Sequence, residues 1–355
     1  MSTIIKWSLG IDVGSKFIRC CLSSIDITQA VKIKASRKLP NTAAGLQELL
    51  RWIKKYYTDE QVPLSITMEA TGVYYERCAL LLQKEGLRVS VVLPTRAKRY
   101  MQALGLKTKN DKIDAEGLSR MGAEQQLKQW SAASSLYYEL RLLTRQHEDL
   151  QKSITSFTNQ LHAVEHGMYR FEGIENNYKE MIAKLQILCG QVKEAIDEVI
   201  EGDETLQQKV KLLCSIKGVG TLTAATIIAE TNGFALFENI KQLVSYTGYD
   251  VVENQSGDHV GKTKISKKGN SHIRRILHMP ALNVVTYEVK PFADLYQRVF
   301  SRTGIKMKGY VAVQKKLLTM MYTLWKRNKL FEPDYQKTIR EKEPESSFGL
   351  ASQKP

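Results

Sequence analysis

Long apolar runs are absent from this sequence of 355 residues. No stretch reaches the roughly 18 consecutive apolar residues that a membrane-spanning helix needs, and Met1–Lys6 lacks the apolar core of a secretory signal. Cysteine is also scarce, because the five cysteines are scattered, odd in number and form no Cys-x-x-Cys pair. That pattern argues against a disulfide framework and a structural zinc site. We therefore expect a cytoplasmic protein with no membrane partner.

Acidic residues are nearly missing from one segment. Between Gly261 and Leu330 there are 16 Lys and Arg but only two acids, Glu288 and Asp294. This segment accounts for nearly all of the formal net charge of +15. A solvated basic face is one interpretation. An excess this concentrated favours contact with phosphates, and nucleic acid is the commonest polyanionic partner.

Strand and helix patterns alternate over residues 1–130. Three strands, then helix, strand, helix and strand are predicted, at Ser8–Val13, Phe17–Ser24, Val31–Leu39, Ala43–Tyr57, Leu64–Glu69, Val73–Glu85 and Arg88–Leu93. This is the RNase H-like order of elements. We therefore expect an α/β domain with a mixed sheet and helices on its faces.

A heptad pattern occupies residues 131–205. Apolar residues alternate in steps of three and four from Leu136 to Val164, with His147 at one seam position, and again from Tyr178 to Val199. The pattern predicts coiled-coil helices, either folded as an antiparallel hairpin or paired with another chain. We interpret His147 as a tolerated polar residue of the seam and give it no role.

A glycine turn opens the third segment, residues 206–335. Gly218-Val219-Gly220 precedes a helical run at Thr221–Glu230 and resembles a helix-hairpin-helix turn. Such glycines let the backbone approach a phosphate, and the next helix offers free N–H groups. Glycine turns between helices are common, so the motif alone is weak. We predict a mainly helical C-terminal domain here and a disordered tail over residues 336–355.

Acids occur in positions suited to metal binding in three short strings. Asp12 lies inside an apolar strand, Glu69 ends a second strand, and Asp111 and Asp114 lie three residues apart, on one face of a predicted helix start. A carboxylate on a buried strand is costly unless a cation compensates it, and carboxylate oxygens are ligands for Mg²⁺. Two such ions about 4 Å apart clamp the attacking and leaving oxygens of a phosphodiester.

Each acid also has a simpler interpretation when taken alone. Asp111 and Asp114 are typical of acids that cap a helix start, and Glu69 is typical of a strand end at the surface. Asp12, followed by Val13 and Gly14, also fits the phosphate loop of an actin-like ATPase or sugar kinase. The order Asp, Glu, Asp-x-x-Asp is more specific than any of its parts.

These strings resemble the DEDD transposases of the insertion sequence 110 family, whose relatives include the Piv-type DNA invertases. The resemblance covers nearly the whole chain, and Glu69–Tyr74 and Asp111–Ala115 are its most specific strings. It implies a RuvC-like N-terminal domain in which Asp12, Glu69, Asp111 and Asp114 bind Mg²⁺, with Mn²⁺ as the alternative. A coiled-coil region and a C-terminal transposase domain would follow.

The C-terminal strings imply a second component of the chemistry. Family members carry a nucleophilic serine in the Ser-Gly string, which corresponds to Ser256 here, and Ser266 is the second choice. Serine attack on a phosphodiester would give a phosphoserine link that conserves the bond energy for rejoining. The metal site would activate the hydroxyl if the two domains met around one phosphate. Without the resemblance, a serine before glycine in a polar loop is usually a turn residue.

Nucleic-acid contacts are expected from the glycine turn and from the basic strings around Lys-Lys-Gly-Asn, which would neutralise phosphate charge. The residues are Gly218, Gly220, Lys262, Lys264, Lys267, Lys268, Arg274 and Arg275. Double-stranded donor and target DNA are the expected partners. The resemblance also implies a structured bridge RNA that pairs with both DNAs, and assembly into a homodimer or tetramer.

Four alternatives remain open. A RuvC-like junction nuclease would need the acids but neither the serine nor the basic C-terminal half. A Piv-like invertase would share every residue named above. An actin-like ATPase or sugar kinase would need a second glycine-rich phosphate loop where the heptads lie. A non-catalytic nucleic-acid-binding protein would tolerate replacement of the acids.

Overall fold

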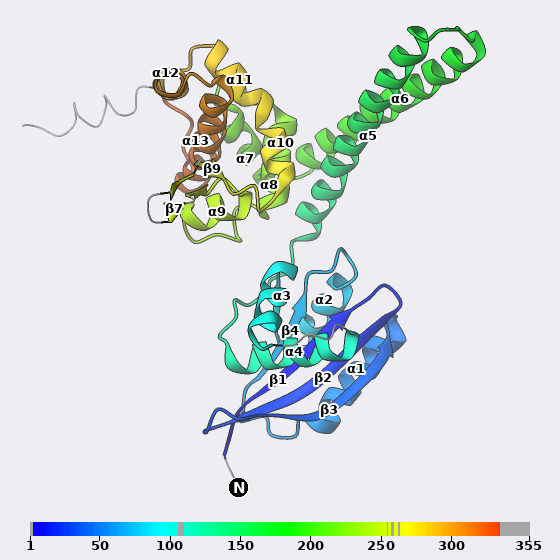
Figure 1. Cartoon of the computed structure of the whole chain (residues 1–355), viewed down its shortest axis with the longest axis vertical. Helices are drawn as coiled ribbons and strands as arrows, with labels where there is room; N and C mark the ends of the chain where they lie inside the picture. Colours follow the sequence, from blue (N-terminus) through cyan, green and yellow to red (C-terminus); the bar gives the residue numbers. More distant parts are fainter. Residues whose placement is uncertain (1–2, 106–109, 254, 257–258, 262, 334–355) are drawn as a thin grey trace, which may run out of the picture. The chain divides into compact units, whose positions relative to one another are not determined.

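The computed structural model describes residues 3–105, 110–253, 255–256, 259–261 and 263–333. The chain divides into two compact units between Ala132 and Ala133 (Figure 1). Residues 336–355, for which a disordered tail is predicted, lie outside the described residues. None of the helices in the described ranges is long and apolar enough to span a membrane.

The first unit is built on a five-stranded mixed sheet with the strand order β3-β2-β1-β4-β5. Neighbours among β1, β2 and β3 are antiparallel, whereas β4 is parallel to both β1 and β5. The predicted mixed α/β organisation is therefore confirmed. The strands are β1 (Ile4–Val13), β2 (Phe17–Asp26), β3 (Val31–Pro40), β4 (Leu64–Glu69) and β5 (Arg88–Val92).

Four helices accompany this sheet, whereas the sequence predicted three: Ala43–Tyr57, Val73–Glu85 and a helix that starts near Asp111. They are α1 (Ala43–Tyr56), α2 (Glu76–Lys84), α3 (Pro94–Ala103) and α4 (Asp111–Glu124). The sequence pattern did not predict α3, because Pro94 was interpreted only as the end of a strand. Pro94 is instead in the first turn of α3, where its missing N–H has no intrahelical partner to lose.

Alternating residues of β1 give the sheet two different faces. Leu9, Ile11 and Val13 are buried in a core shared with α1 and α2. The intervening Ser8 and Gly10 lie against α4, whose Ser119 hydroxyl donates a 2.9 Å hydrogen bond to the Ser8 carbonyl oxygen. The two-residue period of a strand therefore assigns apolar side chains to one face and small or polar ones to the other.

Two glycines allow α4 to lie directly on the sheet. A Cβ atom at Gly10 would be 2.1 Å from the Ala115 carbonyl oxygen, and one at Gly122 would be 2.3 Å from Thr67 Oγ1. Gly122 lies against Ser8, so α4 runs in the opposite direction to β1. Asp12 lies two residues beyond Gly10 on β1. The first turn of α4, which precedes Ala115, therefore lies at the level of Asp12.

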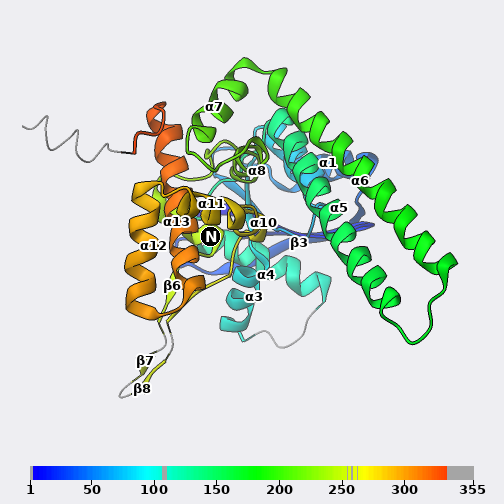
Figure 2. The same cartoon turned by 90° about the horizontal axis from the view of Figure 1, so that it is seen from above.

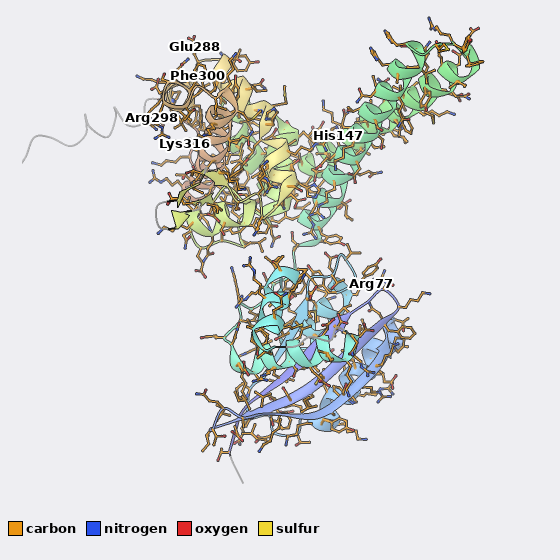
Figure 3. All side chains as sticks on the ribbon, viewed as in Figure 1. Arg77, His147, Glu288, Arg298, Phe300 and Lys316 are labelled. Carbon is orange, nitrogen blue, oxygen red and sulfur yellow. The ribbon has the colours of Figure 1, made fainter. Side chains whose placement is uncertain are left out.

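The second unit begins with two long helices, α5 (Ser135–Glu165) and α6 (Glu172–Glu201). They pack against each other as an antiparallel hairpin, with Gln151 Nε2 3.0 Å from Cys189 Sγ and the rings of Phe157 and Tyr178 6.2 Å apart. The predicted long helices are present, but α6 starts six residues before the Tyr178 pattern. His147 is half-buried in α5 (Figure 3), and burial lowers the pKa of its imidazole.

The rest of the second unit is mainly helical, as predicted, around a core that includes the fully buried Phe234, Tyr249 and Phe292. Its helices are α7 (Glu204–Cys214), α8 (Thr221–Thr231), α9 (Ile240–Thr247), α10 (Ser271–Ile276), α11 (His278–Thr286), α12 (Lys290–Thr303) and α13 (Lys306–Arg327).

Four two-residue strands in this unit were not predicted. They are β6 (Val251–Val252), β7 (Gln255–Ser256), β8 (His259–Val260) and β9 (Lys264–Ile265). Since β6 pairs with β9 and β7 with β8, both antiparallel, the strands form nested ladders of one hairpin. Figure 2 shows β7 and β8 projecting from the helices of this unit.

Gly10→Ala should destabilise the first unit. The new methyl group would meet two backbone atoms, the Ala115 oxygen and the Ser119 nitrogen 2.2 Å away, so α4 and the sheet would have to separate. We expect a loss of about 1–3 kcal/mol or more in the free energy of unfolding, measured by urea denaturation.

Gly117→Ala on α4 is the matched control. Its Cβ would meet only the side chain of Met101, at 3.0 Å, which can move. The higher helix propensity of alanine, worth about 1 kcal/mol, offsets that crowding. Equal stability of the Gly10→Ala and Gly117→Ala proteins would contradict the close packing of α4 on β1.

Candidate active site

A single row of residues crosses the first unit's sheet. Asp12 of β1 is opposite Arg19 of β2, which is opposite Lys38 of β3. On the other side, Ile11 pairs with Met68, so Asp12 and Glu69 are the next residues on two neighbouring strands. Asp12 follows Gly10, and Glu69 follows Thr67, by two residues, so both belong to the face that carries α4. Two acids and two bases therefore lie in adjacent strands, about 4.8 Å apart from strand to strand.

The other two acids are supplied by the first turn of α4. Asn110 is the N-cap, and its side-chain oxygen accepts a 2.9 Å hydrogen bond from the Ile113 N–H. Asp111 and Asp114 are therefore helical residues, and the capping role suggested for them belongs to Asn110. Both acids lie in the first turn of α4, at the positive end of the helix dipole.

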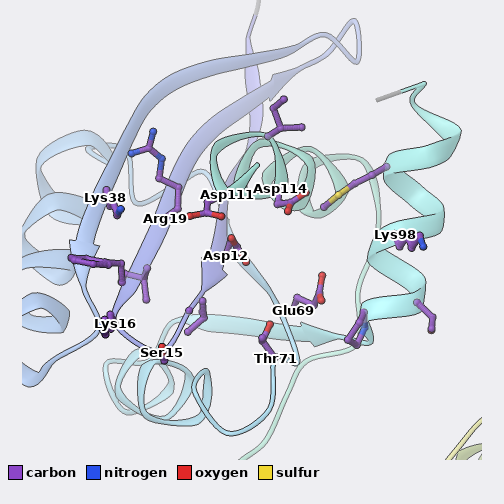
Figure 4. A pocket seen from close by; sticks show the side chains of 18 of the residues that line it. Asp12, Ser15, Lys16, Arg19, Lys38, Glu69, Thr71, Lys98, Asp111 and Asp114 are labelled. Atoms are coloured by element: carbon purple, nitrogen blue, oxygen red, sulfur yellow. The ribbon is translucent and has the colours of Figure 1, made fainter. Parts of the chain in front are cut away.

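All four predicted carboxylates line one cavity of about 780 Å³ (Figure 4). Asp12 comes from β1, Glu69 from the end of β4, and Asp111 and Asp114 from α4. Between 40 and 60 residues of chain separate the three segments, so only the fold brings them together. The cavity is therefore the candidate active site of the first unit.

Four cations line the same cavity, and the sequence analysis assigned none of them. They are Lys16, Arg19, Lys38 and Lys98. Arg19 had a visible signal, because it interrupts an otherwise apolar strand start. Lys98 had none, because its helix α3 was not recognised. An acidic centre with a basic border suits a phosphodiester, whose own charge the acids would otherwise repel.

The spacing of the acids bears on whether they could bind a metal ion. Among the described residues, no three His, Cys, Asp or Glu side chains are grouped closely enough to hold a metal ion. The donors nevertheless fit a hard divalent cation, because four carboxylates from the strand ends and α4 surround one cavity. Like charges repel one another, which accounts for carboxylates that border a cavity without converging.

Ser256 belongs to the second unit, in β7, where its backbone pairs with His259 of β8. The base of this hairpin is anchored by three backbone hydrogen bonds of 2.8–3.0 Å: Ser266 N–H to Asp250 oxygen, Lys267 N–H to Gly248 oxygen, and Asn270 N–H to Tyr246 oxygen. Ser266, the second-choice nucleophile, is therefore at the anchored base, where its hydroxyl also accepts a hydrogen bond from Lys268 N–H.

Some of the predicted nucleic-acid-binding residues are exposed, whereas others form hydrogen bonds or ion pairs within the protein. Lys264, Lys267 and Lys268 are exposed, and Lys262 lies outside the described residues. The Arg274 guanidinium instead donates to the carbonyl oxygens of Thr247, at 2.7 Å, and Asn270, at 3.2 Å. Arg275 lies 3.3 Å from a carboxylate oxygen of Glu148 in α5. Both arginines therefore form interactions that stabilise the second unit.

The two glycines of the predicted helix-hairpin-helix turn have different surroundings. Gly218 has φ +102° and faces α11, where an added Cβ would lie 3.0 Å from Asn283 Cβ. Gly220 is exposed, has open space where a Cβ would be, and is the N-cap of α8. Packing accounts for Gly218, and only Gly220 leaves room for a close ligand.

An ion pair between the half-exposed Arg145 and the buried Glu230 connects α5 to the base of the hairpin that carries Ser256. Arg145 of α5 binds both carboxylate oxygens of Glu230, at 2.6 and 2.9 Å, and Asn270 Nδ2 donates to Glu230 at 2.6 Å. Burial alone would raise the pKa of Glu230, but the hydrogen bonds and charge of Arg145, with the Asn270 amide, hold it below its ordinary value. The ionised carboxylate therefore stabilises the folded unit.

Glu230→Gln should lower the free energy of unfolding at pH 7 by about 1.5–3 kcal/mol, the usual range for hydrogen bonds to charged groups. A lowered folded-state pKa gives stability that is present above the unfolded value, about 4.3, and is lost as the pH falls through the folded one. The stability difference from the natural protein should therefore shrink below about pH 4 in urea titrations.

Glu180→Gln is the control, because Glu180 forms an exposed pair with Lys184 on α6. It should leave stability unchanged at either pH. A Glu230→Gln protein with the same deficit at every pH would mean that the charge of Glu230 does not stabilise the fold.

Comparisons with known proteins extend over both units. A family model of DEDD transposases of the insertion sequence IS110 type, described as transposase, matches residues 9–169, and the model "Transposase IS116/IS110/IS902 family" matches residues 210–297. The pilin gene-inverting protein of Moraxella bovis is 26% identical over 92% of this chain and 98% of its own. The transposase of insertion sequence element IS1111A from Coxiella burnetii is 23% identical over 54% of this chain and 58% of its own.

Among solved structures, RuvC of Thermus thermophilus, in complex with a Holliday junction, covers 35% of this chain and 99% of its own, at 10% identity and a TM-score of 0.27. That likeness is too distant to carry an argument, so the assignment depends on the sequence matches. The two family models match successive segments in the same order and together span well over half of the chain. The chain therefore belongs to the insertion sequence 110 family of DEDD transposases, which are DNA-recombining enzymes.

Proposed function

We propose that this transposase cuts and rejoins DNA with a metal-bound carboxylate site in an RNase H-like first unit and a serine nucleophile, Ser256, in the second. The observation that carries the proposal is the single cavity lined by Asp12, Glu69, Asp111 and Asp114. Four acids from three separate chain segments do not stabilise the fold by lying around one cavity, because their negative charges repel one another. A functional role explains the arrangement better.

Divalent metal ions, Mg²⁺ or alternatively Mn²⁺, would supply the positive charge that stabilises the attacking and leaving oxygens. Asp12 and Glu69, on adjacent strands of a rigid sheet, would hold them from one side. Asp111 and Asp114, fixed by the Asn110 cap, would hold them from the other. The cations on the border of the cavity would bind the non-reacting phosphates.

The serine step balances as a transesterification. The Ser256 Oγ–H loses its proton to an acceptor, Oγ forms a bond to phosphorus, and one P–O bond of the DNA breaks. The released strand end takes up a proton as a hydroxyl. Reversal by another strand's hydroxyl breaks the P–Oγ bond and rejoins DNA without an external energy source.

The nucleic-acid partners follow from charge and family. Donor and target DNA would contact Lys264, Lys267 and Lys268, which are exposed near the hairpin. A structured bridge RNA would select the sites by base pairing, so that the protein reads mainly backbone and shape. A homodimer or tetramer would supply more than one copy of each site, as exchange between two DNAs requires.

The covalent step can be tested by incubating the purified protein with labelled element-end DNA, Mg²⁺ and co-expressed RNA. A denaturing gel should show a DNA-linked species that disappears on protease treatment. We expect Ser256→Ala to abolish it, Ser266→Ala to retain it, and Asp12→Asn or Glu69→Gln to reduce strand exchange by orders of magnitude.

The controls separate the competing functions. Free cleaved ends that require the acids but not Ser256 would favour a RuvC-like junction nuclease. Normal recombination by both Asp12→Asn and Glu69→Gln would favour a non-catalytic nucleic-acid-binding protein. Circular dichroism of each variant checks that a lost activity does not reflect a lost fold.

Replacing Lys267 and Lys268 together with Ala should weaken DNA binding and flatten its dependence on salt. Each lost phosphate contact lowers the slope of log K against log salt by about 0.9 on duplex DNA, so the pair should lower it by about 1.8. Fluorescence anisotropy measures this slope. The matched control replaces Lys54 and Lys55, an exposed basic pair on α1. An equal change of slope in both double variants would mean that Lys267 and Lys268 do not belong to the DNA-binding surface.

Site-specific DNA inversion is the second candidate function. It is favoured by the pilin gene-inverting relative, which matches 92% of this chain. Inversion and transposition would use the same residues, so the arrangement of the DNA sites decides between them. A plasmid with two inverted sites and a reporter between them would flip its reporter orientation in inversion and lose or gain the element in transposition.

A further inference from the structure

We propose that Arg19, Lys38 and Phe17 form a strand-binding subsite that holds unpaired DNA next to the carboxylate cavity. This subsite rests on the proposed function, because it identifies the strand from which the reacting phosphate would come. The three residues lie on β2 and β3, outside the four acids of the proposed metal site.

The position of the two cations is fixed by strand pairing. Arg19 is opposite Asp12, and Lys38 is opposite Arg19, so the cations occupy successive places in one row that leads away from the acids. Directly paired residues point to the same face of a sheet. The two steps from Asp12 to Lys38 cover about 10 Å, which is longer than a single phosphate group, so the row can follow a stretch of strand.

Arg19 has a hydrogen-bond donor that an anionic ligand could bind. Its Nε is buried and has no hydrogen-bond partner in the described structure. A buried donor without an acceptor is costly, and a planar guanidinium binds phosphate oxygens through two parallel hydrogen bonds. A phosphate in the cavity beside Asp12 would satisfy this donor.

Phe17 distinguishes a nucleic-acid strand from a small phosphate ligand. Its ring is 49% exposed and lines the cavity. Lys38 Nζ lies 4.3 Å from the ring centroid, so a cation and an aromatic face are combined on the surface. Alternating cations and exposed aromatics are the usual platform for single strands, because bases stack on the rings while the cations bind the backbone.

Electrostatics indicate why the strand would approach from this side. Four carboxylates repel a phosphodiester, and the cations of the cavity offset that repulsion. Lys16 and Lys98 also line the cavity (Figure 4), but neither belongs to the row that continues from Asp12 across β2 and β3. We assign the strand to DNA because DNA is the substrate of the adjacent acids.

The first measurement is lysine footprinting of the full-length protein with an acylating reagent and mass spectrometry. Unlabelled single-stranded DNA of mixed sequence should protect Lys38 several-fold more than Lys54, an exposed lysine of α1. No variant is needed, so a folding defect cannot imitate the result. Equal modification of Lys38 with and without DNA would overturn the proposal.

The second measurement is the salt dependence of binding to the same DNA. Arg19→Gln and Lys38→Gln should each lower the slope of log K against log salt by about 0.7, which is about a fivefold loss of affinity at 0.1 M salt. Lys54→Gln removes the same charge and should change nothing. Phe17→Ala should weaken single-stranded more than duplex DNA binding, since only unpaired bases can stack on the ring.

Two further outcomes are decisive. Loss of affinity for single-stranded RNA, with DNA binding unchanged, would overturn the assignment to DNA. An equal loss in Lys38→Gln and Lys54→Gln would reduce the subsite to general surface charge. Because these assays measure binding without reaction, a protein that forms no serine–DNA link would contradict the proposed function while leaving the subsite test intact.

Discussion

The direct contact between α4 and β1 at Gly10 determines where the acids of the first unit lie. The α4 backbone lies directly against Gly10, and Gly122 of α4 lies against the hydroxyls of Ser8 and Thr67, because neither glycine has a side chain. The antiparallel direction of α4 then carries Asp111 and Asp114 to the level of Asp12. A larger residue at either position would lift α4 from the sheet and separate its two acids from those of β1 and β4. The cavity therefore depends on two positions that have no chemistry of their own.

In the second unit, some of the basic residues predicted to contact nucleic acid form hydrogen bonds within the protein instead. Arg274 holds two carbonyl oxygens at the hairpin base, and Arg145 and Glu230 connect α5 to Asn270. The segment that carries Ser256 is thus held at its base by partly buried, charge-assisted hydrogen bonds, which are stronger than neutral ones. Lys267 and Lys268, by contrast, are exposed.

The row Lys38, Arg19, Asp12 and Glu69 places bases directly beside acids on one face of a sheet. Under the proposed function, such an arrangement would serve two needs of phosphodiester chemistry. The acids suit metal ions, and the bases suit the phosphates that do not react. Neither group would serve alone, because acids without bases repel DNA and bases without acids bind it without holding a metal.

The sequence by itself determined the elements of the sheet, the two long helices and the four acids, because periodicity and short motifs are local properties that survive without a fold. It did not reveal α3, the short strands around Ser256 or the basic border of the cavity. Strand register alone places Arg19 beside Asp12 and Lys38 beside Arg19. The tertiary structure likewise decided that Gly218 packs on α11 and that Asn110 caps α4. These facts depend on contacts between residues far apart in the chain, which no local pattern records.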